Sequence, residues 1–315
     1  MKKFVRKMAL FLCLFLTMLL LLDILSAKPP FRGWLAAVTK SSDYPVAKME
    51  VDEAVERVKA QSAATKLVIG DSVCKQLFDG LSGENPEYCF AGNNRAVTIA
   101  GEYVLIKEFL EQHEETEEVY LFVGMDALQA ELDVEYGYQY VMIPFGNAGL
   151  LPEFKEETRQ QMQELYGVLF VQKPVIRLVG DSSVNRKLYL NYLKDTGTVK
   201  SAEETNGKIS EITAQYLPEI AALCEKAGVS FYLLPTVFAE EEDRRSQARL
   251  LEQSVKQRGL ESYFTEYFCN MAFYPSEQFS DGVHFGGEFE EQEELNRKIR
   301  EVYVEKGYLQ GLRMK

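Results

Sequence analysis

Histidine is scarce in this chain, because its 315 residues include only His113 and His284. Two histidines cannot form a three-histidine zinc site, and the sequence has no H-E-x-x-H motif. A Walker A loop is absent, as is a G-x-G-x-x-G sequence after a strand-like run. The G-x-S-x-G motif of α/β-hydrolases is missing too. The sequence therefore indicates no metal site and no cofactor.

Cysteine is sparse as well, and no C-x-x-C pair occurs. Cys13 lies in an apolar segment, whereas the other four are widely spaced: Cys74, Cys89, Cys224 and Cys269. The sequence leaves open whether these four form one or two disulfides or stay as buried thiols. An N-x-S/T sequon is also missing, which favours a bacterial cell surface over a eukaryotic secretory origin.

Basic side chains are outnumbered, since 35 Lys and Arg face 48 Asp and Glu and the net charge is -13. Residues 1–27 hold four basic side chains and one acidic one, so the rest of the chain is more acidic still. Such a charge argues against nucleic acid and anionic lipid as partners of the main body.

The N-terminus has the pattern of an export signal. Lys2, Lys3, Arg6 and Lys7 precede the uncharged run "ALFLCLFLTMLLLL" at 9–22. Its length lies between that of a signal-peptide core and the roughly 20 residues of a membrane span. We therefore expect residues 1–27 to form either an N-terminal membrane helix or a cleaved signal peptide. The basic residues would keep this end in the cytoplasm, so the rest of the chain would be a single-pass domain outside the cell or a secreted one.

Residues 28–48 read as an irregular stem, and the folded part begins near residue 49. Strand-like runs at 66–70, 117–124 and 229–235 alternate with helical patterns at 97–112, 211–228, 239–258 and 288–306. This alternation predicts a three-layer α/β/α fold with a central parallel sheet. The alternation blurs around 130–200, which we interpret as an insertion or lid within a domain spanning 49–315.

Gly-Asp-Ser follows a strand-like run twice, at Gly70-Asp71-Ser72 and at Gly180-Asp181-Ser182. A serine at this place lies at the carboxyl end of a strand, where the active sites of open α/β sheets gather. Either serine alone is equally typical of a helix N-cap. We expect Ser72 to be the functional serine, because the distance from Ser72 to the C-terminal histidine spans a whole α/β domain. A nucleophile at Ser182 would leave the strands before it unexplained.

Near the C-terminus, "FSDGVHFGG" places Asp281 three residues before His284. This spacing lets the carboxylate reach Nδ1 of the imidazole, which leaves Nε2 free to accept a proton from a serine hydroxyl. Ser72, His284 and Asp281 are therefore the predicted nucleophile, base and orienting acid. The remaining histidine, His113 in "EQHEETEE", is predicted to lie at a solvated helix end, and Cys74 is predicted to pack beneath the Ser72 turn.

These motifs resemble the first and last sequence blocks of the SGNH/GDSL hydrolases, and the resemblance spans about 50 to 306. It implies a flavodoxin-like fold in which the Ser72 N–H and Gly92, in "FAGNNRA", form an oxyanion hole. The third block of that family ends in asparagine, whereas this chain has Asp126 after Gly124-Met125. Asn93 and Asn94 are alternative donors, and Asp126 is either a helix N-cap or a repurposed site residue.

With an export signal, the chain is similar to exported SGNH-like proteins that add, move or remove O-acyl groups on surface polysaccharides, as in alginate acetylation and teichoic-acid alanylation. The resemblance implies an extracytoplasmic serine esterase or O-acyltransferase acting on acyl, foremost acetyl, esters of cell-surface glycans. Because of Asp126, the alternative is a catalytically inactive surface protein that binds glycan or scaffolds an envelope complex. A third possibility is that the motif matches are accidental and the chain is another exported α/β enzyme.

Overall fold

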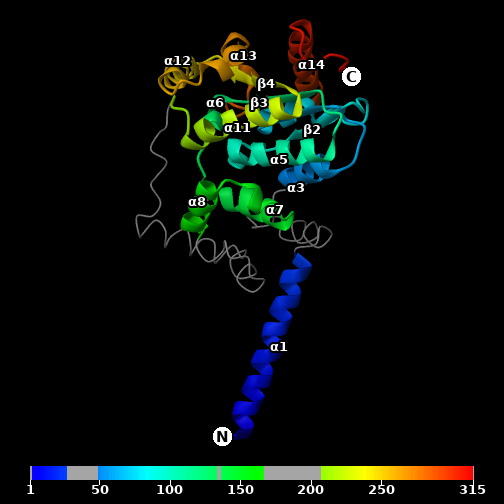
Figure 1. Ribbon diagram of the computed structural model, residues 1–315, viewed down its shortest axis with the longest axis vertical. Coiled ribbons are helices and arrows are strands. Elements are labelled where there is room, and N and C mark those ends of the chain that lie inside the picture. The colour runs from blue at the N-terminus through cyan, green and yellow to red at the C-terminus, as the bar shows by residue number, and fades with distance from the viewer. Residues whose placement is uncertain (1, 27–48, 133–135, 167–206, 315) are drawn as a thin grey trace. The chain divides into compact units, whose positions relative to one another are not determined.

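The computed structural model describes residues 2–26, 49–132, 136–166 and 207–314 (Figure 1). The chain divides into two compact units, of which the first comprises Met1–Lys48 with Asp133–Ser201 and the second Met49–Leu132 with Ala202–Lys315. Residues 133–201, which overlap the insertion predicted around 130–200, belong to the first unit, and the insertion itself stays a prediction. The stem predicted at 28–48 and the Gly180-Asp181-Ser182 turn lie outside the described residues.

The first unit is helical where it is described. Its elements are α1 (Lys2–Ser26), η3 (Tyr138–Met142), α7 (Ile143–Asn147), η4 (Leu151–Glu153) and α8 (Glu156–Tyr166). The rings of Phe145 and Phe154 pack edge to face, with their centroids 5.1 Å apart. Among the residues that the structure describes, no helix is both long and apolar enough to cross a bilayer, so the predicted N-terminal membrane helix has no support here.

The second unit contains the central sheet. Its strands are β1 (Lys66–Gly70), β2 (Tyr88–Gly92), β3 (Glu118–Val123) and β4 (Ser230–Pro235). They pair in parallel in the order β2-β1-β3-β4, which confirms the predicted parallel sheet. Because all four run the same way, their carboxyl ends share one edge of the sheet, and the first residues after β1 and β3 meet there.

Helices cover both faces of this sheet (Figure 1). On one face α5 (Thr98–Gln112) lies between α3 (Met49–Lys59) and α11 (Glu211–Ala227). On the other face α4 (Ser72–Phe78) packs against α14 (Phe289–Glu305). Val68 of β1 packs into the apolar cluster under α4 and α14. Its neighbours Leu67 and Ile69 point to the opposite face of the sheet and are buried as well. A strand buried on both faces needs such an unbroken apolar run.

A smaller parallel sheet of β5 (Val237–Ala239) and β6 (Ala272–Tyr274) continues from the end of β4. Between its strands lie α12 (Glu242–Gln257), η6 (Glu261–Tyr263) and α13 (Thr265–Cys269). After β6 come η7 (Ser276–Gln278) and a tight loop in which Phe279 and Phe285 form an antiparallel bridge. This loop carries Asp281 and His284.

Two predictions about isolated residues are settled by burial. His113 is buried rather than solvated, because its ring stacks on Phe109 with centroids 4.0 Å apart and its Nε2 lies 3.0 Å from Ser62 Oγ. The expected solvated helix end is therefore wrong. All five cysteines are free, and Cys74 is buried beneath the Ser72 turn as predicted. Of the alternatives for the cysteines, the structure supports free thiols.

Candidate active site

The turn after β1 is held by the carboxyl group of Asp71, which is 5% exposed. Its Oδ1 accepts the N–H groups of Val73 at 3.0 Å and Cys74 at 3.2 Å, so Asp71 caps the start of α4. Its Oδ2 accepts the N–H of Gly124 at 2.6 Å, at the residue that follows β3. Asp71 thus ties the carboxyl ends of two neighbouring strands together and fixes Ser72 as the first residue of α4.

Burial raises the pKa of Asp71, although the three backbone N–H groups oppose this effect. The carboxyl group is therefore a buried structural acceptor rather than a solvated charge. In the sequence it looks like an ordinary N-cap, and the bond to Gly124 appears only once β1 and β3 are paired.

Ser72, His284 and Asp281 form one chain of hydrogen bonds. Ser72 Oγ lies 2.7 Å from His284 Nε2, and His284 Nδ1 lies 2.8 Å from Asp281 Oδ2. With the proton on Nδ1 and donated to Asp281, Nε2 is left to accept the serine hydroxyl. The structure thus brings together the three predicted residues in the order of contacts that an activated serine needs.

The Asp281 carboxylate also shapes its own loop. Its Oδ1 accepts the backbone N–H groups of Val283 at 3.0 Å and His284 at 2.7 Å, and Gly282 between them takes a φ of +75°. Burial alone would raise the pKa of Asp281, but the bonds from the His284 backbone and imidazole and from Val283 lower it to about 2. The carboxylate is therefore ionised at neutral pH and supports a positive charge on the imidazole.

Gln76, one helical turn after Ser72, connects the nucleophile's helix to the histidine loop. Its Nε2 donates to the carbonyl of Phe285 at 3.1 Å, and its Oε1 accepts the Phe285 N–H at 3.1 Å. Phe285 is itself buried against Phe279, with ring centroids 5.0 Å apart. The same short helix thus holds Ser72 and positions His284. Sequence reasoning missed Gln76, because a glutamine on a short amphipathic helix carries no local signal.

Gly92 occupies the last position of β2, where space decides its identity. A Cβ at this position would lie 2.5 Å from the backbone nitrogen of Lys75 and 2.6 Å from its Cα. Only glycine lets α4 approach β2 this closely. The structure gives Gly92 this packing role, and its predicted part in an oxyanion hole stays a prediction.

The two asparagines after Gly92 serve their own loop. Asn93 Nδ2 donates to Glu102 Oε2 at 3.2 Å and to the Ala91 carbonyl at 3.3 Å. These bonds use both of its donors, which argues against Asn93 as an oxyanion donor. Asn94 Oδ1 accepts the Ala96 N–H at 3.0 Å and so caps η2 (Arg95–Val97). A role for Asn94 toward a ligand stays a prediction.

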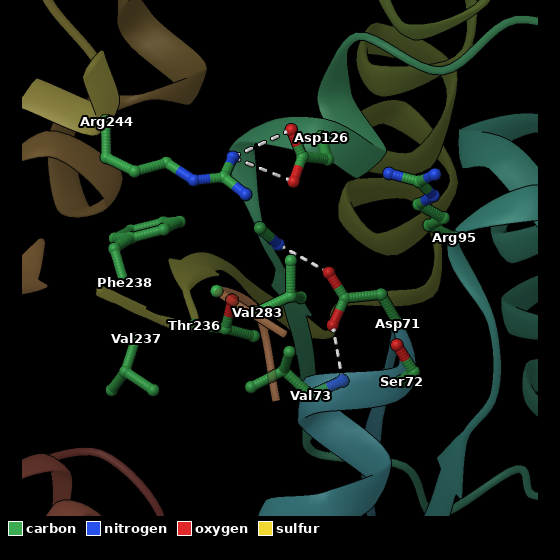
Figure 2. A pocket seen from close by; sticks show the side chains of 12 residues that line it. Asp71, Ser72, Val73, Arg95, Asp126, Thr236, Val237, Phe238, Arg244 and Val283 are labelled. Carbon is green, nitrogen blue, oxygen red and sulfur yellow. Dashed lines mark hydrogen bonds and ion pairs between the residues drawn. The ribbon is translucent and has the colours of Figure 1, made fainter. Parts of the chain in front are cut away.

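Asp126 lies in α6 (Met125–Leu128), where Gly124 is the N-cap residue, so its reading as an N-cap is wrong. Both of its oxygens accept from Arg244 Nη1, at 3.0 Å and 2.9 Å, and Gln247 Nε2 donates to Oδ1 at 3.1 Å. Arg244 thus compensates the charge that stands where the SGNH resemblance expects an amide. Figure 2 shows Asp126 turned toward Arg244. Arg244 belongs to a helix whose charged pattern reads as solvated surface in the sequence.

One pocket lies beside these groups, and its walls include Ser72, Asp71, Asp126, Arg244, Arg95 and Thr236 (Figure 2). Thr236 is 1% exposed, and its hydroxyl has no hydrogen-bond partner among the described residues. Within those same residues, no cluster of three or more His, Cys, Asp or Glu could hold a metal ion. The polar groups that line this pocket thus include the hydroxyls of Ser72 and Thr236 and the guanidinium groups of Arg95 and Arg244.

Comparison of the chain with protein-family models, with curated proteins and with solved structures finds no match. No family is therefore assigned, and the resemblance to SGNH hydrolases continues to rest on the quoted motifs.

Proposed function

We propose that this chain is an SGNH-like serine esterase or O-acyltransferase with Ser72 as its nucleophile. The observation that carries the proposal is the unbroken path Ser72 Oγ, His284 Nε2, His284 Nδ1, Asp281 Oδ2, with steps of 2.7 Å and 2.8 Å between the side chains. A serine hydroxyl is a weak nucleophile until a base accepts its proton, and this geometry supplies the base and its orienting acid.

In the first half-reaction, Ser72 Oγ attacks the carbonyl carbon of the ester while its proton passes to His284 Nε2. The imidazolium is stabilised by Asp281, whose low pKa keeps it ionised. The tetrahedral intermediate then collapses, the bond to the alcohol oxygen breaks, and His284 returns the proton to that oxygen. The products are the free alcohol and an acyl group on Ser72.

In the second half-reaction, His284 removes a proton from water or from an acceptor hydroxyl, whose oxygen attacks the acyl carbon. The bond between this carbon and Ser72 Oγ then breaks, and His284 returns the proton to Oγ. Water gives hydrolysis and a sugar hydroxyl gives transfer. The Ser72 N–H, at the first position of α4, has no hydrogen-bond partner among the described residues and is the donor we propose for the oxyanion.

The substrate part of the proposal is an acyl ester, foremost an acetyl ester, on a glycan outside the cell. It is supported by the SGNH-like motifs and by the export pattern of residues 1–27. The alternative of a silent glycan-binding or scaffolding protein draws on one observation, the carboxylate of Asp126 in place of an amide.

The test is labelling of the full-length chain with a fluorophosphonate, followed by peptide mapping of the adduct. We expect one adduct, on Ser72. His284→Ala should slow labelling at least ~100-fold, since general-base assistance contributes about that much, and Ser72→Ala should abolish it. Ser262→Ala, at an exposed serine on η6, is the matched control and should label normally.

An adduct on Ser182 would contradict the choice of nucleophile. A folded protein that gives no adduct would favour the silent alternative.

A further inference from the structure

The guanidinium of Arg95 lies at the pocket that holds Ser72, and no residue in the described part of the chain pairs with it. Arg95 is the first residue of η2, its side chain is exposed, and it lines the same pocket as Ser72 and Asp126. Figure 2 shows it entering from the side opposite Arg244, with no interaction drawn to any neighbour. Its backbone carbonyl accepts the Thr98 N–H, but none of the described residues forms a hydrogen bond, ion pair or ring contact with its side chain.

The other charges of this pocket are matched. Arg244 forms an ion pair with Asp126 at 2.9 Å, and both oxygens of Asp71 accept backbone N–H groups. Arg95 therefore adds a positive charge that no described side chain offsets, in a chain whose net charge is -13. A positive charge without a described partner, next to a nucleophile in an otherwise acidic protein, favours binding of an anionic group from another molecule.

The backbone that carries Arg95 is fixed in place. Glu102 holds the amide of Asn93, and Asn94 caps the N–H of Ala96, so hydrogen bonds flank Arg95 on both sides. The loop ends at Thr98, which adopts a φ of +61° although it is β-branched and buried. A residue in this conformation is retained only where the surrounding packing enforces it. The loop thus presents Arg95 from a preorganised backbone, which lowers the cost of binding.

We propose that Arg95 binds a negatively charged group of the substrate, so that the ester attacked by Ser72 belongs to an anionic molecule such as a glycan bearing carboxylate or phosphate. This inference rests on the proposed function and names its substrate class. Arginine suits the task because its planar fork donates two parallel hydrogen bonds to a carboxylate or phosphate.

The experiment compares two fluorophosphonates whose tails have equal length and end in a carboxylate or in a carboxamide. The second-order rate of adduct formation on Ser72 is measured for the full-length protein and for its variants. We expect the unmodified protein to react about tenfold faster with the carboxylate probe, as a charge-assisted hydrogen bond on a partly solvated site allows.

Arg95→Gln should bring the ratio of the two rates close to one, and Arg95→Lys should retain most of the preference. Raising the salt concentration should reduce the preference, because the site is open to solvent. The matched control is Arg249→Gln, an exposed arginine of α12 that pairs with Glu242, and it should leave the ratio as it is.

Equal rates with both probes in the unmodified protein would overturn the inference, as would a preference that survives Arg95→Gln. Equal slowing of both probes in Arg95→Gln would also overturn it, because Arg95 would then serve the reaction regardless of substrate charge. Failure of both probes to label Ser72 would contradict the proposed function itself, and the inference would fall with it.

Discussion

At the scale of single residues, the neighbours Asp71 and Ser72 divide the work of the turn. The carboxyl of Asp71 points inward and receives three backbone N–H groups, from both sides of the junction between β1 and β3. The hydroxyl of Ser72 contacts the imidazole of His284 instead. A buried carboxyl group with this many bonds orients the backbone more firmly than an exposed cap does, because losing any of them leaves a buried polar group unpaired.

Glu102 is a second buried carboxyl group near the site, 3% exposed and bonded to Asn93. Burial raises its pKa well above 4.5, the hydrogen bond from Asn93 opposes this, and the charge of Asp71 adds to the rise. The folded protein therefore holds this proton more tightly than the unfolded chain does. The stabilisation is complete below the unfolded pKa near 4.5 and is lost as the pH rises through the folded pKa.

We predict that Glu102→Gln reduces the fall in melting temperature between about pH 5 and pH 8, because glutamine still accepts from Asn93 and does not titrate. Melting curves across this range test it, with Glu111→Gln on the exposed side of the same helix as control. Parallel curves for the unmodified protein and Glu102→Gln would contradict the prediction.

At the scale of elements, α4 is a short helix whose two ends are held by neighbouring segments of the chain. Its first turn is capped by Asp71, and Gln76 bonds to the loop before α14. Its last carbonyl groups accept from α14, since Asn296 donates to Gln76 O at 3.0 Å and the buried Arg300 donates to Leu77 O at 2.6 Å. These are the groups that a helix end leaves unpaired, so α14 completes the helix that bears the nucleophile.

The close approach of β2 to this helix gives a prediction for Gly92→Ala. Because the new Cβ would meet the Lys75 backbone at 2.5 Å, α4 must shift, at a cost of roughly 1–3 kcal/mol of stability. We also expect slower fluorophosphonate labelling of Ser72, since the shift would lengthen its contact with His284. Alanine keeps the backbone N–H, so such slowing reports the displaced helix.

The matched control is Gly80→Ala, because a Cβ there would meet no atom within 4 Å. Denaturant melts and labelling rates compare the two variants. An unchanged free energy of unfolding in Gly92→Ala would contradict the close contact between β2 and α4 at this position.

At the scale of the whole molecule, folding separates the five thiols by access. Cys74, Cys89 and Cys224 are buried, whereas Cys13 and Cys269 are exposed. Burial raises the pKa of Cys89 and of Cys224 to about 12, which suppresses the reactive thiolate in both. The buried thiols are therefore protected from oxidation and alkylation as long as the chain is folded.

We predict that a thiol reagent modifies Cys269 in the native protein and reaches Cys74, Cys89 and Cys224 only after unfolding, and that reductant leaves the melting temperature unchanged. Peptide mapping of the alkylated cysteines, without prior reduction, provides the measurement. A pair that resists alkylation after unfolding but reacts after reduction would reveal a disulfide and contradict the free thiols.

Much of the framework is predictable from local patterns. The predicted strands at 66–70, 117–124 and 229–235 match β1, β3 and β4, because buried parallel strands need unbroken apolar runs. Strand β2 was not predicted, because "YCFAG" is an apolar run of only five residues, whose periodicity does not distinguish a strand from a helical segment. The three-residue strands β5 and β6 exist only through their mutual pairing, which no local pattern encodes.

The sequence by itself determined the alternation of strands and helices and the identity of Ser72, Asp281 and His284 as candidates, because periodicity and short motifs are properties of neighbouring residues. Only the tertiary structure decided that Ser72 and His284, 212 residues apart, are in contact and that Gln76 and Asp71 hold them in place. It also decided that Arg244 offsets Asp126, whereas no described residue pairs with the side chain of Arg95. These features depend on distances between segments far apart in the chain, which are fixed when the carboxyl ends of the parallel strands meet at one edge of the sheet.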